Sequence, residues 1–204
     1  MFQVIKNEPT SFIKARKKVK LPKIKSAWED KNISSIRQDL RKYILENEQD
    51  SLCVYCEKKI TFDKRYSNID HFKTRNIFPE KSLVYNNLLV SCNTYNRCSS
   101  VKDNKKQSIV KSKDDYLKIV DVVVENPDNC FDYLITGEIV AVNSKGQFTI
   151  DTFNLNDSSL IERRLFIFQS LKYFGNLSLA EIYTSFGYEY KSFIKSIYPK
   201  LKEL

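Results

Sequence analysis

The chain has 204 residues, and its 34 lysine and arginine residues against 25 acidic ones give a formal net charge of +9 at pH 7. A hydrophobic fraction of 42% and a charged fraction of 29% are typical of a globular protein and exclude an intrinsically disordered chain. No apolar stretch reaches the roughly 20 residues of a membrane span, and no signal peptide precedes the first polar residues, so we expect a cytoplasmic protein without a membrane partner.

Two residue counts narrow the possible chemistry. With 4 glycines the sequence contains neither GxGxxG nor GxxxxGK[ST], the loops that bind dinucleotides and ATP. His71 is the single histidine, which excludes sites built from several histidines.

The N-terminal part combines a basic segment with a helical pattern. Residues 1–26 are predicted to be extended or irregular because Pro9 and Pro22 interrupt them. Residues 11–25 contain seven basic side chains and no acidic one, which suits a phosphate backbone, although a solvated surface explains any single lysine. Residues 27–47 carry apolar side chains at intervals of three and four, which predicts a helix.

The cysteines form two pairs. An odd total of 5 in a chain without a signal peptide argues against a disulfide framework. Cys53 and Cys56 form a CxxC pair, Cys92 and Cys98 form a wider one, and Cys130 is expected to be a packed core residue. Two thiolate pairs can complete a tetrahedral Zn²⁺ site, which supplies folding energy where the core is small. Buried free cysteines are less favoured because a hydrophilic turn follows the first pair, and a thioredoxin-like redox pair lacks its βαβ setting.

The rest of the chain predicts short extended segments followed by helices, which makes one compact α+β unit. The expected elements are a hairpin knuckle at 52–63, a strand at 66–72, an extended run at 83–91, a short helix after Cys98 capped by Ser99 or Ser100, a hairpin at 131–142 turning at Gly137, an extended piece at 149–153, a helix from Leu160 that stops at Gly175-Asn176, a helix capped by Ser178 that stops at Gly187, and a third helix ended by Pro199.

Asp70 and His71, at the end of the predicted 66–72 strand, can carry hydrolytic chemistry. A neutral imidazole can deprotonate water for attack on a phosphodiester, and an adjacent carboxylate can hold a divalent cation that stabilises charge on the phosphate. An asparagine downstream, in the pair Asn86-Asn87, can fix the imidazole by a hydrogen bond across a hairpin. Taken alone, His71 would more often be an ordinary histidine; its place between two cysteine pairs favours catalysis.

This order of CxxC, Asp-His, Asn-Leu, Cys, Cys and Lys resembles the HNH endonucleases. The resemblance implies a ββα-metal core stapled by a four-cysteine structural zinc site, with flanking helices and a helical C-terminal lobe. It implies His71 as general base, Asp70 as a ligand of catalytic Mg²⁺ or Mn²⁺, and Asn87, or less favourably Asn86, as the residue that orients the base. The zinc ligands it implies are Cys53, Cys56, Cys92 and Cys98.

The sequence departs from the HNH pattern at one position. The family usually has His or Asn directly after the last cysteine as the final metal ligand, where this chain has Ser99. Either Ser99 ligates weakly, or Asp103 or Asn104 reaches in from the next turn, or Asp70 and the phosphate hold the metal.

A second basic stretch follows the cysteines. It runs from residue 102 to 113 with Asp103 as its only acid, and its expected phosphate contacts are Lys102, Lys105 and Lys106.

Further motifs resemble a narrower HNH group found in Septu-type and retron-associated antiphage systems. They are Tyr55-Cys56-Glu57, Ile69-Asp70-His71-Phe72, Leu88–Cys92, Gly137-Glu138-Ile139 and the run from Thr149 to Arg164, with Phe153 where Leu is usual. Most of residues 28–165 are covered. In such systems the HNH protein works beside an SMC/ABC-type ATPase, so the resemblance implies DNA and that ATPase as partners.

The expected organisation is a basic N-terminal segment at 1–26, an HNH core with zinc knuckle at 27–125, and a β-hairpin plus helical region at 126–204 that forms one compact unit with the core. Two functions remain open: a metal-dependent HNH endonuclease that cleaves DNA in an antiphage complex, or a zinc-stabilised module that binds nucleic acid or its partner without cleavage. The Asp70-His71 pair favours the first and Ser99 the second. A cysteine-based redox protein is a third, less favoured reading.

Overall fold

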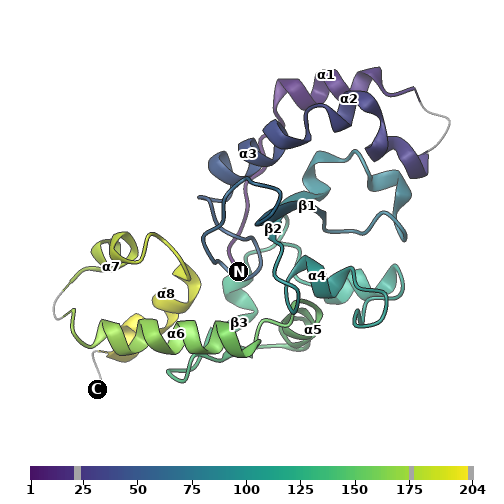
Figure 1. The fold of residues 1–204 in the computed structure, drawn as a ribbon. Helices are drawn as coiled ribbons and strands as arrows, with labels where there is room; N and C mark the ends of the chain where they lie inside the picture. Colours follow the sequence, from purple (N-terminus) through teal and green to yellow (C-terminus); the bar gives the residue numbers. More distant parts are fainter. Residues whose placement is uncertain (21–23, 175–176, 202–204) are drawn as a thin grey trace.

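The computed structural model describes residues 1–20, 24–174 and 177–201, and it has the predicted α+β character. Helices surround two separate two-stranded sheets (Figure 1). The α-helices of the described residues are α1 (Thr10–Lys18), α2 (Lys31–Ser34), α3 (Arg37–Asn47), α4 (Ser99–Lys102), α5 (Ser144–Phe153), α6 (Ser158–Leu171), α7 (Leu179–Ser185) and α8 (Lys191–Leu201). The strands are β1 (Ser67–His71), β2 (Leu88–Cys92), β3 (Phe131–Tyr133) and β4 (Ile139–Ala141). Short 3-10 helices are η1 (Ile24–Glu29), η2 (Pro79–Lys81), η3 (Tyr85–Asn87), η4 (Asp114–Lys118) and η5 (Pro127–Asn129).

Helix α1 shows that the prediction of an extended or irregular segment at 1–26 was wrong for residues 10–18, whereas residues 1–9 form neither helix nor strand. Pro9 is the N-cap, with extended backbone angles, and the helix begins directly after it. Phe12 and Ala15 are buried on one face, and the basic residues of the last turn interact favourably with the helix C-terminus. Pro22 lies outside the described residues.

The helix predicted over 27–47 is divided into η1, α2 and α3. The Asp30 side chain accepts a hydrogen bond from Asn32 N and thereby starts a new helix. The apolar periodicity nevertheless identified buried positions, since Ile33, Leu40 and Ile44 all lie in the core.

Strands β1 and β2 form the antiparallel sheet on which the site is built. His71 pairs with Leu88 at one end of the sheet and Ser67 with Cys92 at the other, which confirms the predicted strand. The extended run predicted at 83–91 is confirmed only from Leu88 onward, because Tyr85–Asn87 form η3. Helix α4 follows as expected, but its N-cap is Cys98, with φ of 58°, and not Ser99 or Ser100.

The predicted hairpin at 131–142 is present as β3 and β4, whereas residues 149–153 are helical in α5 and not extended. Their β-branched side chains suggested a strand. Two capping asparagines decide the outcome: the Asn143 side chain accepts from Gly146 N, and Asn154 closes the helix in the left-handed conformation.

The C-terminal helices largely follow the sequence pattern. Ser178 caps α7 in a capping box with Glu181, and Gly187 has φ of 59° after that helix. Pro199 lies within α8, which continues to Leu201, so the prediction that Pro199 ends the helix was wrong. Burial of Ile194 and Ile197 holds this last turn despite the missing N–H. The stop predicted at Gly175-Asn176 lies outside the described residues.

The two ends of the molecule are joined by a common core. Figure 1 shows α1 and α2 at one end and α6, α7 and α8 at the other, with β1, β2 and α4 between them. Buried side chains from Val4 to Ile197 belong to one hydrophobic cluster. Over the ranges that the structure describes, no helix is long and apolar enough to cross a membrane.

Gly137→Ala is expected to destabilise the fold by about 3 kcal/mol, because Gly137 has φ of 94° and an added Cβ would lie 2.4 Å from Ile161 O. Gly187→Ala is the matched control: it also needs a positive φ, but the nearest atom would be 3.6 Å away, so the loss should be about 1 kcal/mol. Urea unfolding of the two variants measures the difference. Equal losses would mean that the turn moves freely away from α6.

Candidate active site and metal centre

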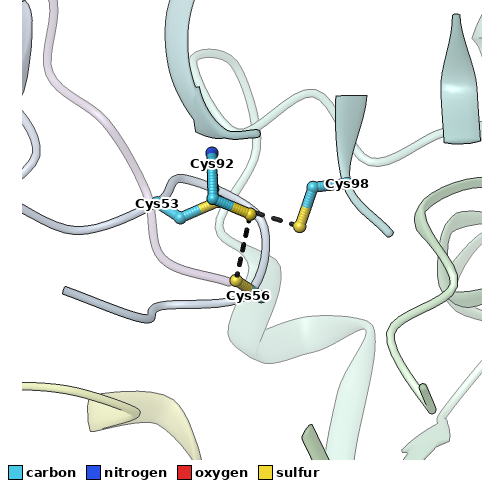
Figure 2. Close-up of side chains that lie close together, drawn as sticks. All are labelled: Cys53, Cys56, Cys92 and Cys98. Carbon is cyan, nitrogen blue, oxygen red and sulfur yellow. Dashed lines mark hydrogen bonds between the residues drawn. The ribbon is translucent and has the colours of Figure 1, made fainter. Parts of the chain in front are cut away.

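Four buried cysteines converge at one point, as the sequence predicted (Figure 2). The sulfurs of Cys53, Cys56, Cys92 and Cys98 all lie within 4.8 Å of one another. The Cys53–Cys98 and Cys56–Cys92 sulfur distances are 3.7 and 4.0 Å. Zn–S bonds of about 2.3 Å in a tetrahedron place sulfurs about 3.8 Å apart. The cluster can therefore hold a metal such as zinc without rearrangement.

Local backbone geometry brings these thiols together. An isolated bridge between Leu52 and Lys59 closes the knuckle that carries the CxxC pair. The Cys92 amide donates to Cys53 Sγ at 3.3 Å, which links the end of β2 to the knuckle. Burial raises the pKa of the Cys98 thiol well above its ordinary value, and a bound cation offsets this because it stabilises the thiolate.

A pocket of about 730 Å³ opens between β1, the loop after it and the α4 region. Five of the site residues predicted from the sequence line it: Asp70, His71, Lys102, Asp103 and Lys105. The other lining residues that matter for the chemistry are Trp28, Asn68, Arg75 and Lys111.

His71 is 7% exposed and is held as a neutral imidazole. Its Nε2 lies 3.0 Å from Ser82 O, and the Trp28 ring packs edge-on against it at 4.6 Å. Burial lowers the pKa of His71 to about 4, although the Ser82 carbonyl and the Asp70 charge oppose this. Because a carbonyl only accepts, Nε2 carries the proton and Nδ1 is left as an acceptor. This is the protonation state that a general base requires at neutral pH.

Asp70 lies in a buried ionic cluster with Lys102. Both side chains are 0% exposed, and the Lys102 ammonium lies 3.1 Å from Asp70 Oδ1, 2.7 Å from Asp103 Oδ1 and 2.9 Å from His71 O. Burial alone would lower the pKa of Lys102, but the charges of Asp70 and Asp103 raise it above its ordinary value. Desolvation and the Asp70 charge raise the pKa of Asp103 to about 7. The carboxylates of Asp70 and Asp103 thus share one counterion, the Lys102 ammonium.

One oxygen of Asp70 is left without a hydrogen bond. The Tyr55 hydroxyl donates to Oδ2, while Oδ1 is buried and has no hydrogen-bond partner in the part of the chain that the structure describes. Oδ1 is instead ion-paired with the Lys102 ammonium, whereas the Asp103 side chain is 47% exposed in the pocket. Carboxylate oxygens are the ligands that a hard divalent cation such as Mg²⁺ or Mn²⁺ prefers, so the donor set of Asp70 and Asp103 has the chemistry that such an ion needs.

Asn87 and Ser99 are buried near the pocket but make other contacts. The Asn87 amide donates to Lys73 O at 3.0 Å and Lys81 O at 3.2 Å, and its Oδ1 accepts from Lys73 N at 2.7 Å. These bonds fix the loop that positions the Ser82 carbonyl beside His71. Ser99 Oγ lies 3.3 Å from the Asn68 side-chain amide, with which it exchanges a hydrogen bond.

The basic residues divide into buried and exposed ones. Lys102 is fully buried in its ion pairs, whereas Lys105 and Lys106 are exposed. Lys105 and Arg75 stand at the pocket wall. Sequence reasoning did not find Arg75 or Trp28, and no motif around either residue signalled a role.

Lys102→Met is expected to lower the free energy of unfolding by about 3–5 kcal/mol, because it leaves the Asp70 carboxylate buried without its counterion. Lys118→Met is the control, since its 3.0 Å pair with Asp115 is exposed and should contribute less than about 1 kcal/mol. Thermal or urea unfolding separates the two. Similar stabilities for both variants would show that Asp70 does not depend on Lys102.

Part of the chain is similar in sequence to a known protein. No family model matches the chain. Septu protein PtuB of Bacillus thuringiensis is 29% identical over 107 residues, which cover 51% of this chain and 36% of that protein. The match thus spans about a third of the relative's length. It supports a Septu-type relationship for this chain.

Proposed function

We propose that this chain is a metal-dependent endonuclease of the HNH type that cleaves DNA in the cytoplasm as the nuclease of an antiphage defence complex. The observation that carries the proposal is the presence, in one pocket, of a neutral imidazole together with the carboxylates of Asp70 and Asp103. The order of β1, β2 and α4 beside four clustered cysteines supports the HNH type. The similarity to Septu protein PtuB supports the defence role.

Each residue has a role in this proposal. His71 accepts a proton from water at Nδ1, while Ser82 O holds the ring through Nε2. Asp70 and Asp103 would hold Mg²⁺ or Mn²⁺, which when bound stabilises negative charge on the phosphate and the leaving oxygen. Asp103 is favoured over Ser99 as the further ligand because Ser99 Oγ is engaged with Asn68.

Two further groups support the pocket. Asn87 acts on the base indirectly, through the loop that it ties down. The four cysteines would hold Zn²⁺, which fixes the knuckle and the start of α4 relative to β1.

The cations around the pocket, of which the three lysines are exposed and Arg75 is half-buried, would bind the DNA backbone. Lys105, Lys106, Lys111 and Arg75 provide positive charge near the proposed scissile phosphate, and their contacts should weaken with rising salt. Lys102 was predicted to contact phosphate, but in this proposal its role is to hold Asp70 and Asp103 by ion pairs. With no Gly-rich ATP loop in this chain, ATP hydrolysis would belong to an SMC/ABC-type partner.

The proposal is tested by incubating the purified chain with supercoiled plasmid and, separately, with structured RNA, each with Mg²⁺ or Mn²⁺ and with EDTA. Nicked or linear plasmid that depends on the metal is the expected result. Cleavage of RNA alone would keep the nuclease and change its substrate. Cleavage that persists in EDTA would contradict a metal-dependent site.

The second candidate is a zinc-stabilised module that binds nucleic acid or its partner without cleaving. The serine at position 99, where a metal-binding side chain is usual in the resembling family, favours it. It predicts salt-sensitive plasmid binding with no cleavage, both alone and after addition of the ATPase from the same system.

A further inference from the structure

A second hollow, which we call the knuckle groove, lies at the end of the β1–β2 sheet away from His71. Its volume is about 340 Å³. Lys58, Lys59 and Arg65 are among its lining residues, and none of those lining residues is acidic. Tyr66 lines it directly before β1, whereas Asn68, two residues further on, lines the pocket of His71. The two hollows therefore adjoin along β1.

The positive charge of the knuckle groove is only partly neutralised. Lys58 and Lys59 are exposed, and neither forms an ion pair within the ranges that the structure describes. The Glu189 carboxylate accepts a hydrogen bond from the backbone amide of Lys59. Arg65 pairs with Asp63 at 2.6 Å, but its side chain is 73% exposed. Because exposed ion pairs are weak, a phosphate can compete with Asp63 for the guanidinium.

Tyr66 adds an aromatic surface to this charge. It is 57% exposed, and the Arg65 guanidinium lies 5.5 Å from the centroid of its ring. Its backbone is held in place, because Tyr66 O accepts from Asn93 N at 3.1 Å. Exposed aromatic rings beside cations are the surfaces on which proteins stack the bases of single-stranded nucleic acid. A base in a duplex is already stacked on its neighbours, so the Tyr66 ring favours an unpaired strand.

We propose that the knuckle groove binds an unpaired segment of the nucleic-acid substrate. Tyr66 stacks on a base, while Lys58, Lys59 and Arg65 contact phosphates. This inference rests on the proposed function, because it assigns the groove to the strand that the pocket of His71 would cut.

The spacing of the two hollows allows one substrate to occupy both. Tyr66 and His71 are five residues apart, and an extended strand of that length spans about 16 Å. This corresponds to about five nucleotide steps of about 3.4 Å each. The substrate would therefore carry its unpaired segment within a few nucleotides of the bond that is cleaved.

The test is fluorescence anisotropy of the full chain with a labelled 20-nucleotide dT strand, a U strand of the same length and a 20-base-pair DNA duplex, without added Mg²⁺ or Mn²⁺. Tyr66→Ala should weaken single-strand binding by about 5- to 150-fold, the equivalent of one lost base stack, and duplex binding by less than about twofold. Tyr66→Phe keeps the ring and should bind as wild type does. Zinc content by elemental analysis should be the same in all variants.

Tyr173→Ala is the matched control. It removes a tyrosine that is 91% exposed just beyond the end of α6, and it should bind the single strands as wild type does.

The lysines are tested through the salt dependence of single-strand binding. A variant with both Lys58→Gln and Lys59→Gln should reduce the slope of log K against log salt by about 1.4, because each phosphate contact to a single strand contributes about 0.7.

Several outcomes would overturn the inference. They are no single-strand binding by wild type, wild-type affinity in Tyr66→Ala, the same loss in Tyr66→Phe or Tyr173→Ala, and equal weakening for single strand and duplex. A loss in the lysine variant without one in Tyr66→Ala would instead favour an acidic segment of a partner protein, which needs the cations but not the ring.

Plasmid cleavage measured in parallel with Mg²⁺ or Mn²⁺ separates the inference from the proposed function. Weaker single-strand binding in Tyr66→Ala with no cleavage by wild type would keep the knuckle groove as a nucleic-acid site and remove the nuclease. Cleavage by wild type with unchanged single-strand binding in Tyr66→Ala would keep the nuclease and remove the groove.

Discussion

Cys98→Ala is expected to abolish zinc binding and to unfold the region around the knuckle. The four sulfurs lie within 4.8 Å of one another, so each thiol depends on the others for a complete tetrahedral site. Apparent binding free energies for structural Zn²⁺ in small domains are about 10–16 kcal/mol at neutral pH, and this binding energy becomes folding energy. Cys98 also begins α4, and its amide donates to Phe153 O at 2.8 Å. Its loss should therefore loosen both α4 and the contact with α5.

The measurement is zinc content by elemental analysis together with thermal unfolding. Wild type should carry about one zinc per chain, and Cys98→Ala should carry almost none. Cys130→Ala provides the control, because Cys130 is a buried cysteine outside the cluster and should leave the zinc content unchanged. A wild-type protein free of zinc, or equal zinc in both variants, would contradict the assignment of these four residues.

His71→Ala is expected to reduce the rate of DNA cleavage by about 10²–10⁴-fold. The imidazole is the only one in the chain, so no second histidine can replace it. Its environment leaves Nδ1 unprotonated at neutral pH, and the Ser82 carbonyl and Trp28 hold the ring in place. DNA affinity should change little, because the exposed lysines and not His71 supply the phosphate contacts of the proposal.

Single-turnover cleavage of a labelled duplex measures this effect, with DNA affinity followed by fluorescence anisotropy. Asn86→Ala is the control: Asn86 is exposed and adjacent to the buried Asn87, and the variant should cleave at the wild-type rate. Retained zinc and an unchanged circular dichroism spectrum would show that His71→Ala is folded. A wild-type rate in folded His71→Ala would remove this residue from the reaction.

Parts of the site that depend on local spacing could be predicted from the sequence. The CxxC pair, the second cysteine pair and the Asp70-His71 strand end follow directly from residue order, and the structure brings the four cysteines together and places Asp70 and His71 at the end of β1. Ser178 was recognised as a cap because the capping box is a short-range pattern. These features need only a few neighbouring residues to form.

Features that depend on tertiary contacts could not be predicted. Lys102 stood in a basic stretch, and nothing in that pattern shows that Asp70, distant in sequence, would bury its ammonium. The side-chain bonds of Asn87 go to backbone groups of the 73–81 loop, whose path is set by packing. Residues 149–153 were misjudged because β propensity yielded to two capping asparagines and to burial of Phe153.

Hydrolysis of DNA at the pocket at the end of β1 is tested most directly by supercoiled-plasmid cleavage in Mg²⁺ or Mn²⁺. Wild type, His71→Ala and Asp70→Asn are compared side by side and at matched zinc content. The proposed site predicts nicked or linear plasmid with wild type and intact plasmid with both variants. Equal cleavage by all three proteins would place the activity elsewhere and contradict the assignment of Asp70 and His71.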